Sequence, residues 1–105
     1  EICIRDRNNL SQAKFRSVVY AMMDEKSEIW EGSFAEREIE KPQLKAFSRE
    51  IASWICQTNG FFDLSELDEF VKGTNRDISA VVLTKVASDL KETVLTMEGA
   101  LVMGA

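Results

Sequence analysis

Residues 77–101 read DISAVVLTKVASDLKETVLTMEGAL, and their apolar residues recur at the pitch of an α-helix. A seam with alternating spacings of three and four runs through the stretch: Ala80, Leu83, Ala87, Leu90, Val94, Met97 and Leu101. Such spacing places side chains on one face of a helix. Further apolar residues between positions 78 and 86 widen this face, which indicates central burial of the first half. We therefore expect a long C-terminal helix that organises the fold.

Four further helices are predicted upstream, each from its own start or stop signal. They span about residues 11–26, 34–40, 42–59 and 63–73. Ser33 and Glu36 have the spacing of a capping box after the break at Gly32. Pro42 suits a first helical turn because it lacks an amide proton, and the pair at residues 59–60 (Asn-Gly) provides a left-handed stop.

These elements predict an all-α protein, a compact bundle of about five helices with a long C-terminal helix. The 105 residues match one domain, residues 1–105, in which residues 1–10 form an extended arm. Because the chain begins with Glu1 rather than Met, we expect the domain to be excised from a longer protein.

The composition narrows the classes of partner. Thirteen Lys and Arg stand against 18 Asp and Glu, a net charge of −5, which repels phosphate backbones and anionic lipids. No run of the roughly 18 apolar residues needed to cross a bilayer occurs. We expect no direct nucleic-acid or membrane partner. The two cysteines lack the spacing of a zinc or redox site, which favours reduced thiols and an intracellular, cytoplasmic location.

Chemistry-bearing residues are sparse. The chain has no histidine, which removes the commonest general base and metal ligand, and its five glycines form no phosphate-binding loop. Cys56 falls near the end of a predicted helix, where the dipole disfavours a thiolate. We expect no catalytic residue, no metal site, no cofactor and no enzymatic activity.

A catalytic alternative rests on two pairs of carboxylates one helical turn apart. The motif Glu-x-x-Glu occurs at Glu25 and Glu28 and again at Glu66 and Glu69, and two such faces can hold Mg²⁺. The pattern resembles that of helical nucleotide pyrophosphohydrolases, although this family has Asp where Glu69 stands. The resemblance implies a Mg²⁺-dependent nucleotide hydrolase, whereas a solvated acidic face explains the same residues without function.

Two features suggest a binding surface. Lys41, Lys45 and Arg49 repeat every four residues and line one edge of a predicted helix, a set that we call the basic ladder. Trp30 lies in the acidic connection beside Gly32, where partial exposure would make it an interface anchor and core packing is the alternative. We take these four residues as the candidate partner-binding set. The bases near the start of the chain could extend the ladder: Arg5, Arg7, Lys14 and Arg16. The alternative for the ladder is a solvated face paired with nearby glutamates.

The leading hypothesis is a non-catalytic adaptor domain that docks an acidic or amphipathic segment of another protein within a larger assembly. In architecture it is similar to the small helical domains of negative-strand RNA virus phosphoproteins, which grip nucleoprotein through a basic patch. A third hypothesis is homodimerisation, because the C-terminal seam has coiled-coil spacing. The residues of that dimer surface would be Leu83, Leu90, Val94, Met97 and Leu101.

Overall fold

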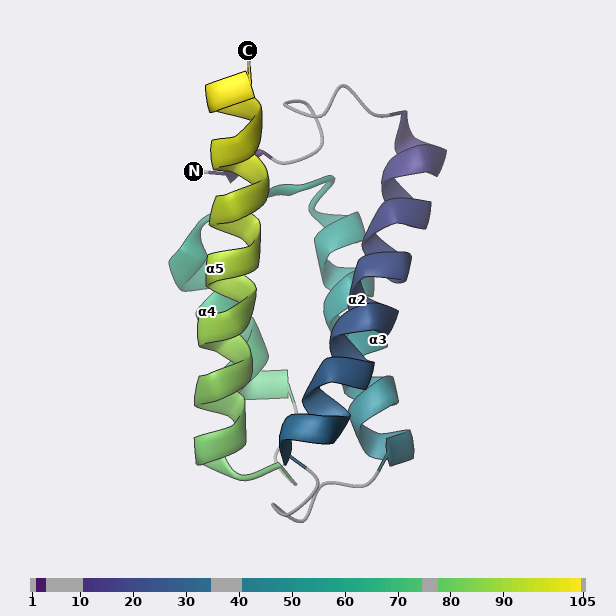
Figure 1. Cartoon of the computed structure of the whole chain (residues 1–105), viewed down its shortest axis with the longest axis vertical. Helices are drawn as coiled ribbons and strands as arrows, with labels where there is room; N and C mark the ends of the chain where they lie inside the picture. Colours follow the sequence, from purple (N-terminus) through teal and green to yellow (C-terminus); the bar gives the residue numbers. More distant parts are fainter. Residues whose placement is uncertain (1, 4–10, 35–40, 75–77, 105) are drawn as a thin grey trace.

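The computed structural model describes residues 2–3, 11–34, 41–74 and 78–104. Within these ranges lie four helices: α2 (Gln12–Phe34), α3 (Lys41–Gln57), α4 (Leu64–Thr74) and α5 (Ala80–Gly104). In the view of Figure 1, α2 and α5 lie in front of α3 and α4. Helices dominate the described residues, as the apolar spacing predicted. The short helix expected over residues 34–40 falls outside them beyond Phe34, so the count of five stays a prediction.

A pair of two-residue β-strands joins the N-terminal arm to the helices. Strand β1 (Ile2–Cys3) pairs antiparallel with β2 (Phe61–Phe62), with Ile2 opposite Phe62 and Cys3 opposite Phe61. Ile2 and Cys3 are thus extended, as expected of the arm, and the rest of the predicted arm lies outside the described residues. Because β2 lies between α3 and α4, this strand pairing ties the start of the chain to the α3–α4 connection.

Helix α2 is longer than predicted. Ser11 caps it, accepting a 3.2 Å hydrogen bond from the Lys14 amide, but the helix continues past Lys26 to Phe34. Its buried face continues through Ser27 and Trp30, and a single Gly costs a helix only about 1 kcal/mol. The predicted break at Gly32 is therefore wrong. The predicted cap Ser33 is wrong too, because Ser33 lies inside α2.

Helix α3 begins and ends close to the predicted residues. Pro42 lies in its first turn, and Asn59 and Gly60 both have positive φ angles, 56° and 83°. The Gly60 amide donates to the carbonyl of Ile55 at 3.1 Å, and the Asn59 amide to that of Cys56 at 3.0 Å. These two bonds form a Schellman motif, which reverses the chain into β2.

The remaining helix starts are fixed by caps. In α4, Glu66 accepts a 3.3 Å hydrogen bond from the Asp63 amide, which is one half of a capping box. Helix α5 begins at Ala80, three residues after the start of the stretch 77–101 that predicted it. Its cap is Ser79, whose carbonyl accepts from the Leu83 amide at 3.0 Å.

One cluster of buried apolar side chains joins all four helices. Its largest fully buried members are Trp30, Phe47, Phe62, Met23, Leu44, Ile51, Ile55, Leu67, Leu90, Val19 and Val71. Aromatic and aliphatic groups of this size supply most of the burial free energy of a small domain. This packing holds α2 and α3 in one arrangement, so the polar groups on their outer faces also keep fixed positions.

Candidate functional site

The basic ladder on α3 faces the acids of α2. Lys45 and Arg49 are exposed, while the side chain of Lys41 lies outside the described part of the chain. The Arg49 guanidinium donates a 3.4 Å hydrogen bond to Asp24 Oδ2. The predicted partners of the ladder were glutamates near it in sequence, whereas the observed partner lies 25 residues away on the neighbouring helix. Part of the ladder is thus engaged within the chain.

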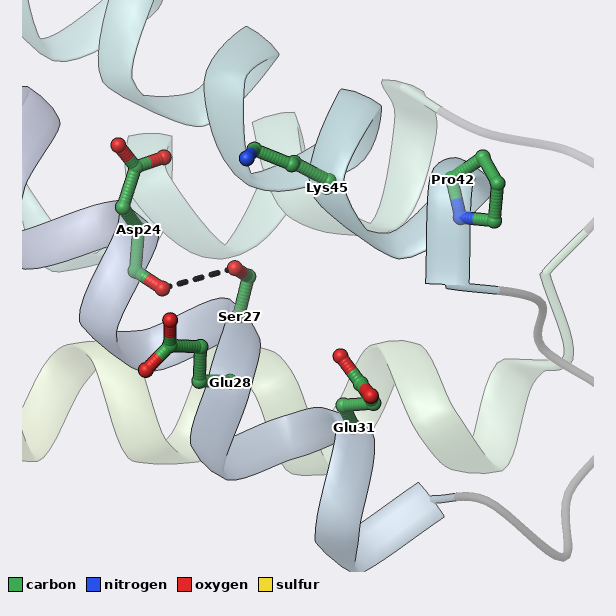
Figure 2. A pocket seen from close by; sticks show the side chains of 6 residues that line it. All are labelled: Asp24, Ser27, Glu28, Glu31, Pro42 and Lys45. Atoms are coloured by element: carbon green, nitrogen blue, oxygen red, sulfur yellow. Dashed lines mark hydrogen bonds between the residues drawn. The ribbon is translucent and has the colours of Figure 1, made fainter.

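The hollow beside Lys45 is acidic on balance. It has a volume of about 550 Å³ and lies between α2 and α3 (Figure 2). Six residues line it: Asp24, Ser27, Glu28, Glu31, Pro42 and Lys45. The Ser27 hydroxyl donates to the carbonyl of Asp24 at 2.8 Å within α2. With three carboxylates and one ammonium group, this hollow repels an acidic segment, so Lys45 is a poor centre for the predicted site.

A second hollow on the same two helices is basic. Its volume is about 320 Å³, and we call it the arginine hollow; its lining residues are Ala13, Arg16, Ser17, Tyr20 and Arg49. The guanidinium carbon of Arg16 lies 4.9 Å from the Tyr20 ring centre, and that of Arg49 lies 5.9 Å from it. Each cation is attracted to the negative face of the ring. The structure therefore brings two arginines from separate helices together over one aromatic ring.

The arginine hollow was only partly foreseen from the sequence. Arg49 belongs to the predicted set, Arg16 is one of the bases near the start of the chain that could extend it, and Tyr20 was not predicted. The spacing of Arg16 and Tyr20, one turn apart on α2, is a signal that could have paired them. Their approach to Arg49 depends on how α2 packs against α3, which no local pattern reports.

Trp30 is not an exposed anchor, so its place in the predicted set is wrong. Its side chain is 2% exposed, and its indole Nε1–H donates a 2.7 Å hydrogen bond to Asp89 Oδ2 on α5. The extension of α2 places Trp30 on the buried face, where both the ring and its polar group have partners. Trp30 therefore packs in the core, which was the alternative interpretation.

The predicted dimer seam on α5 is also occupied within the chain. Leu83, Leu90 and Val94 are buried in the core cluster, so they present no surface to a second copy. The side chains of Met97 and Leu101 lie outside the described residues. Among the described side chains of α5, Val81 and Leu95 are the half-exposed large apolar residues, and they are not part of the seam.

The paired glutamates do not assemble into a metal site. Among the side chains that the structure describes, no group of three or more Asp, Glu, Cys or His residues lies close enough to hold a metal ion. Glu25, Glu28, Glu66 and Glu69 are all exposed, and Glu66 serves as a helix cap. The arrangement offers no support for the hydrolase alternative.

Cys56 has the features of an unreactive thiol. It is half-buried near the C-terminal end of α3. Burial raises the pKa of the thiol above its ordinary value, and the charge of Arg16 opposes this effect only in part. The thiol therefore remains protonated near neutral pH, as the position at a helix end also favours.

Four described helices around one core, with a two-arginine hollow on the α2–α3 face, define an all-α protein with a compact basic surface site. Comparison with protein-family models, curated proteins and solved structures found no match. Among the described residues, no helix has the length and apolarity needed to cross a membrane. Function must therefore be inferred from the surface itself.

Proposed function

We propose that this chain is a non-catalytic interaction domain that docks an acidic segment of a partner protein in the arginine hollow. The observation that supports this proposal is the convergence of Arg16 and Arg49 over Tyr20. A guanidinium group binds a carboxylate through two parallel hydrogen bonds. Two such groups on one rigid surface suit the side chain of Asp or Glu in a partner.

The state of the two arginines fits an open binding site. The ion pairs formed by the described residues do not include Arg16. Arg49 is 51% exposed and its contact with Asp24 is long, so the contact is weak and readily exchanged. Tyr20 is half-buried and limits the rotation of both arginines, which lowers the entropy lost when a carboxylate binds.

The surrounding charge favours a protein partner over nucleic acid. The acidic hollow beside Lys45 adjoins the arginine hollow through Arg49 and Asp24, and the whole chain carries a net charge of −5. A nucleic-acid strand would bring its phosphates close to these carboxylates. A short segment with one or two acidic residues avoids that repulsion, because only its carboxylates need to enter the arginine hollow.

A charge reversal with a matched control tests the proposal. The probe is a fluorescein-labelled peptide of alternating Glu and Ser, titrated into the full chain at low ionic strength. Arg16→Glu should weaken binding about tenfold or more, because it replaces attraction with repulsion at the contact. Lys85→Glu changes the net charge equally at an exposed position on α5 and should leave the affinity within about twofold.

Three outcomes would contradict the proposal. The first is an unchanged affinity in the Arg16→Glu protein. The second is an equal loss in both variants, which would mean that the peptide responds only to net charge. The third is a set of chemical-shift changes that maps the peptide contacts to α5 rather than to the arginine hollow.

A further inference from the structure

The arginine hollow is one of three neighbouring hollows that cross the outer face of α3. The second, of about 200 Å³, is lined by Gln12, Phe15, Arg16, Ser53, Cys56 and Gln57. The third, of about 240 Å³, is lined by Glu50, Ser53, Trp54, Gln57 and Phe70, and we call it the aromatic hollow. Arg16 borders the first and second hollows, while Ser53 and Gln57 border the second and third. The three therefore form a continuous uneven surface from α2 across α3 to α4.

The floor of the aromatic hollow is a preformed aromatic platform. The Trp54 ring stacks on Phe70 with a centroid distance of 5.0 Å and an interplanar angle of 15°. Trp54 also contacts the buried Phe62 at 5.2 Å, which anchors the platform to the core. Both Trp54 and Phe70 are only half-buried. A half-exposed Trp held in one orientation is the kind of residue that dominates protein interfaces.

The charges differ between the two ends of this surface. Arg16 and Arg49 border the arginine hollow, whereas the charged residue that borders the aromatic hollow is Glu50. An acidic residue is thus attracted at the first end and repelled at the second. The aromatic end suits an uncharged apolar side chain, whose contact with the rings removes apolar surface from water.

We infer that the partner of this domain is an amphipathic segment that places an acidic side chain in the arginine hollow and a large apolar side chain on the Trp54–Phe70 platform. This inference rests on the proposed function and specifies the chemistry of its partner. Arg16 and Arg49 attract the acidic side chain at one end and Glu50 repels it at the other, so the segment can cross α3 in only one direction. Ser53, between the hollows, is small enough to let the segment cross α3.

The geometry of α3 sets a minimum spacing for the two partner residues. Arg49 and Trp54 are five residues apart, which corresponds to about 7.5 Å along the helix axis and about 140° around it. A helical segment covers the axial rise alone in about five residues and an extended segment in about two or three, and the step across α3 adds to this distance. Either form gives a short motif with one acidic and one apolar position.

Peptide selection tests the inference without knowledge of the partner. A displayed library of random 12-residue peptides is selected on the full chain, with the Arg16→Glu protein as the counter-selection target. The expected consensus holds one Asp or Glu and one Leu, Ile, Phe or Trp, separated by at least the minimum spacing given above. In a synthetic consensus peptide, replacement of either residue by Ser should lower the affinity about tenfold.

Two measurements on the protein locate the apolar contact. The indole Nε1–H resonance of Trp54 should shift when the peptide binds, while that of buried Trp30 should not. Trp54→Ala should weaken the consensus peptide about tenfold but leave the peptide that lacks the apolar residue unchanged, with circular dichroism verifying the helical fold. The peptide substitutions require no change in the protein, so they remain decisive even if Trp54→Ala unfolds.

The possible results separate the two proposals. A consensus with acidic residues alone, and no effect at Trp54, would overturn this inference while the proposed function stands. A consensus with apolar but no acidic residues, or no enriched peptide at all, would overturn both.

Discussion

The indole Nε1–H of Trp30 donates a 2.7 Å hydrogen bond to Oδ2 of Asp89, 59 residues further along the chain. The other carboxylate oxygen, Oδ1, accepts a 3.2 Å hydrogen bond from Lys26, one turn before Trp30 on α2. Asp89 therefore joins two consecutive turns of α2 to the middle of α5. The contact also explains why α2 continues past Lys26: the added turns bury an indole and satisfy its polar group.

Trp30→Phe should destabilise the protein by about 2–4 kcal/mol. The substitution removes a hydrogen bond to a charged group, worth about 1.5–3 kcal/mol, and leaves a void where the larger ring packed. Chemical denaturation followed by far-ultraviolet circular dichroism measures the free energy of unfolding. Trp54 remains as a fluorescence probe for the same transition.

Ile29→Ala provides the control, because Ile29 precedes Trp30 in α2 and is 51% exposed. Its loss should change the free energy of unfolding by less than about 1 kcal/mol. If Trp30→Phe has an equally small effect, the contact between Trp30 and Asp89 contributes little, and the extension of α2 needs another cause.

The helical class and the positions of α3 and α4 were predictable because their signals are local. The fixed φ of Pro42, the left-handed turn at Asn59 and Gly60, and the cap at Glu66 each act within a few residues of a helix end. The buried side chains of α3 include Leu44, Phe47, Ile51 and Ile55, whose spacing follows the helical period of 3.6 residues and can be read from the sequence.

The site was harder to predict because its contacts join distant residues. Trp30 was misplaced because Gly32 suggested a helix end, whereas its partner Asp89 stabilises the continued helix from far along the chain. The approach of Arg49 to Asp24 and Tyr20 likewise depends on the packing of α2 against α3. Local periodicity reports which face of a helix is buried, but not which residues meet across two helices.

Two glycines should respond to alanine with opposite signs. Gly60 has a φ of 83°, and an L-residue in the left-handed region costs about 1–2 kcal/mol, so Gly60→Ala should destabilise the protein. Gly32 lies inside α2, and a Cβ atom there would meet nothing within 4 Å. Gly32→Ala should therefore stabilise the protein by up to about 1 kcal/mol.

Thermal unfolding of both variants beside the parent chain gives the comparison. A lower melting temperature for Gly60→Ala and a higher one for Gly32→Ala are expected. A loss of stability in Gly32→Ala would show that residue 32 does not occupy the interior of a helix, contrary to the observed extension of α2.

Asp68 should make the stability of the α4–α5 pair depend on pH. It accepts contacts of 2.9 Å from Lys91 on α5 and 3.0 Å from Lys72 on α4. These hydrogen bonds, first that of Lys91 and then that of Lys72, hold the pKa of Asp68 below its ordinary value of 3.8. A lowered folded-state pKa gives stability that is present above the ordinary value and is lost as the pH falls through the folded-state value.

Asp68→Asn should thus lower the free energy of unfolding at neutral pH by about 0.5–1.5 kcal/mol, since both lysines are partly exposed. The difference from the parent chain should shrink as the pH falls below the ordinary value of 3.8, and it should vanish once the carboxyl group is protonated in the folded state as well. Denaturation curves across this range measure it. Glu69→Gln removes the same charge from an exposed neighbour on α4 and serves as the matched control. A difference between Asp68→Asn and the parent that persists unchanged into acid would mean that packing, rather than the charge of Asp68, stabilises the contact between α4 and α5.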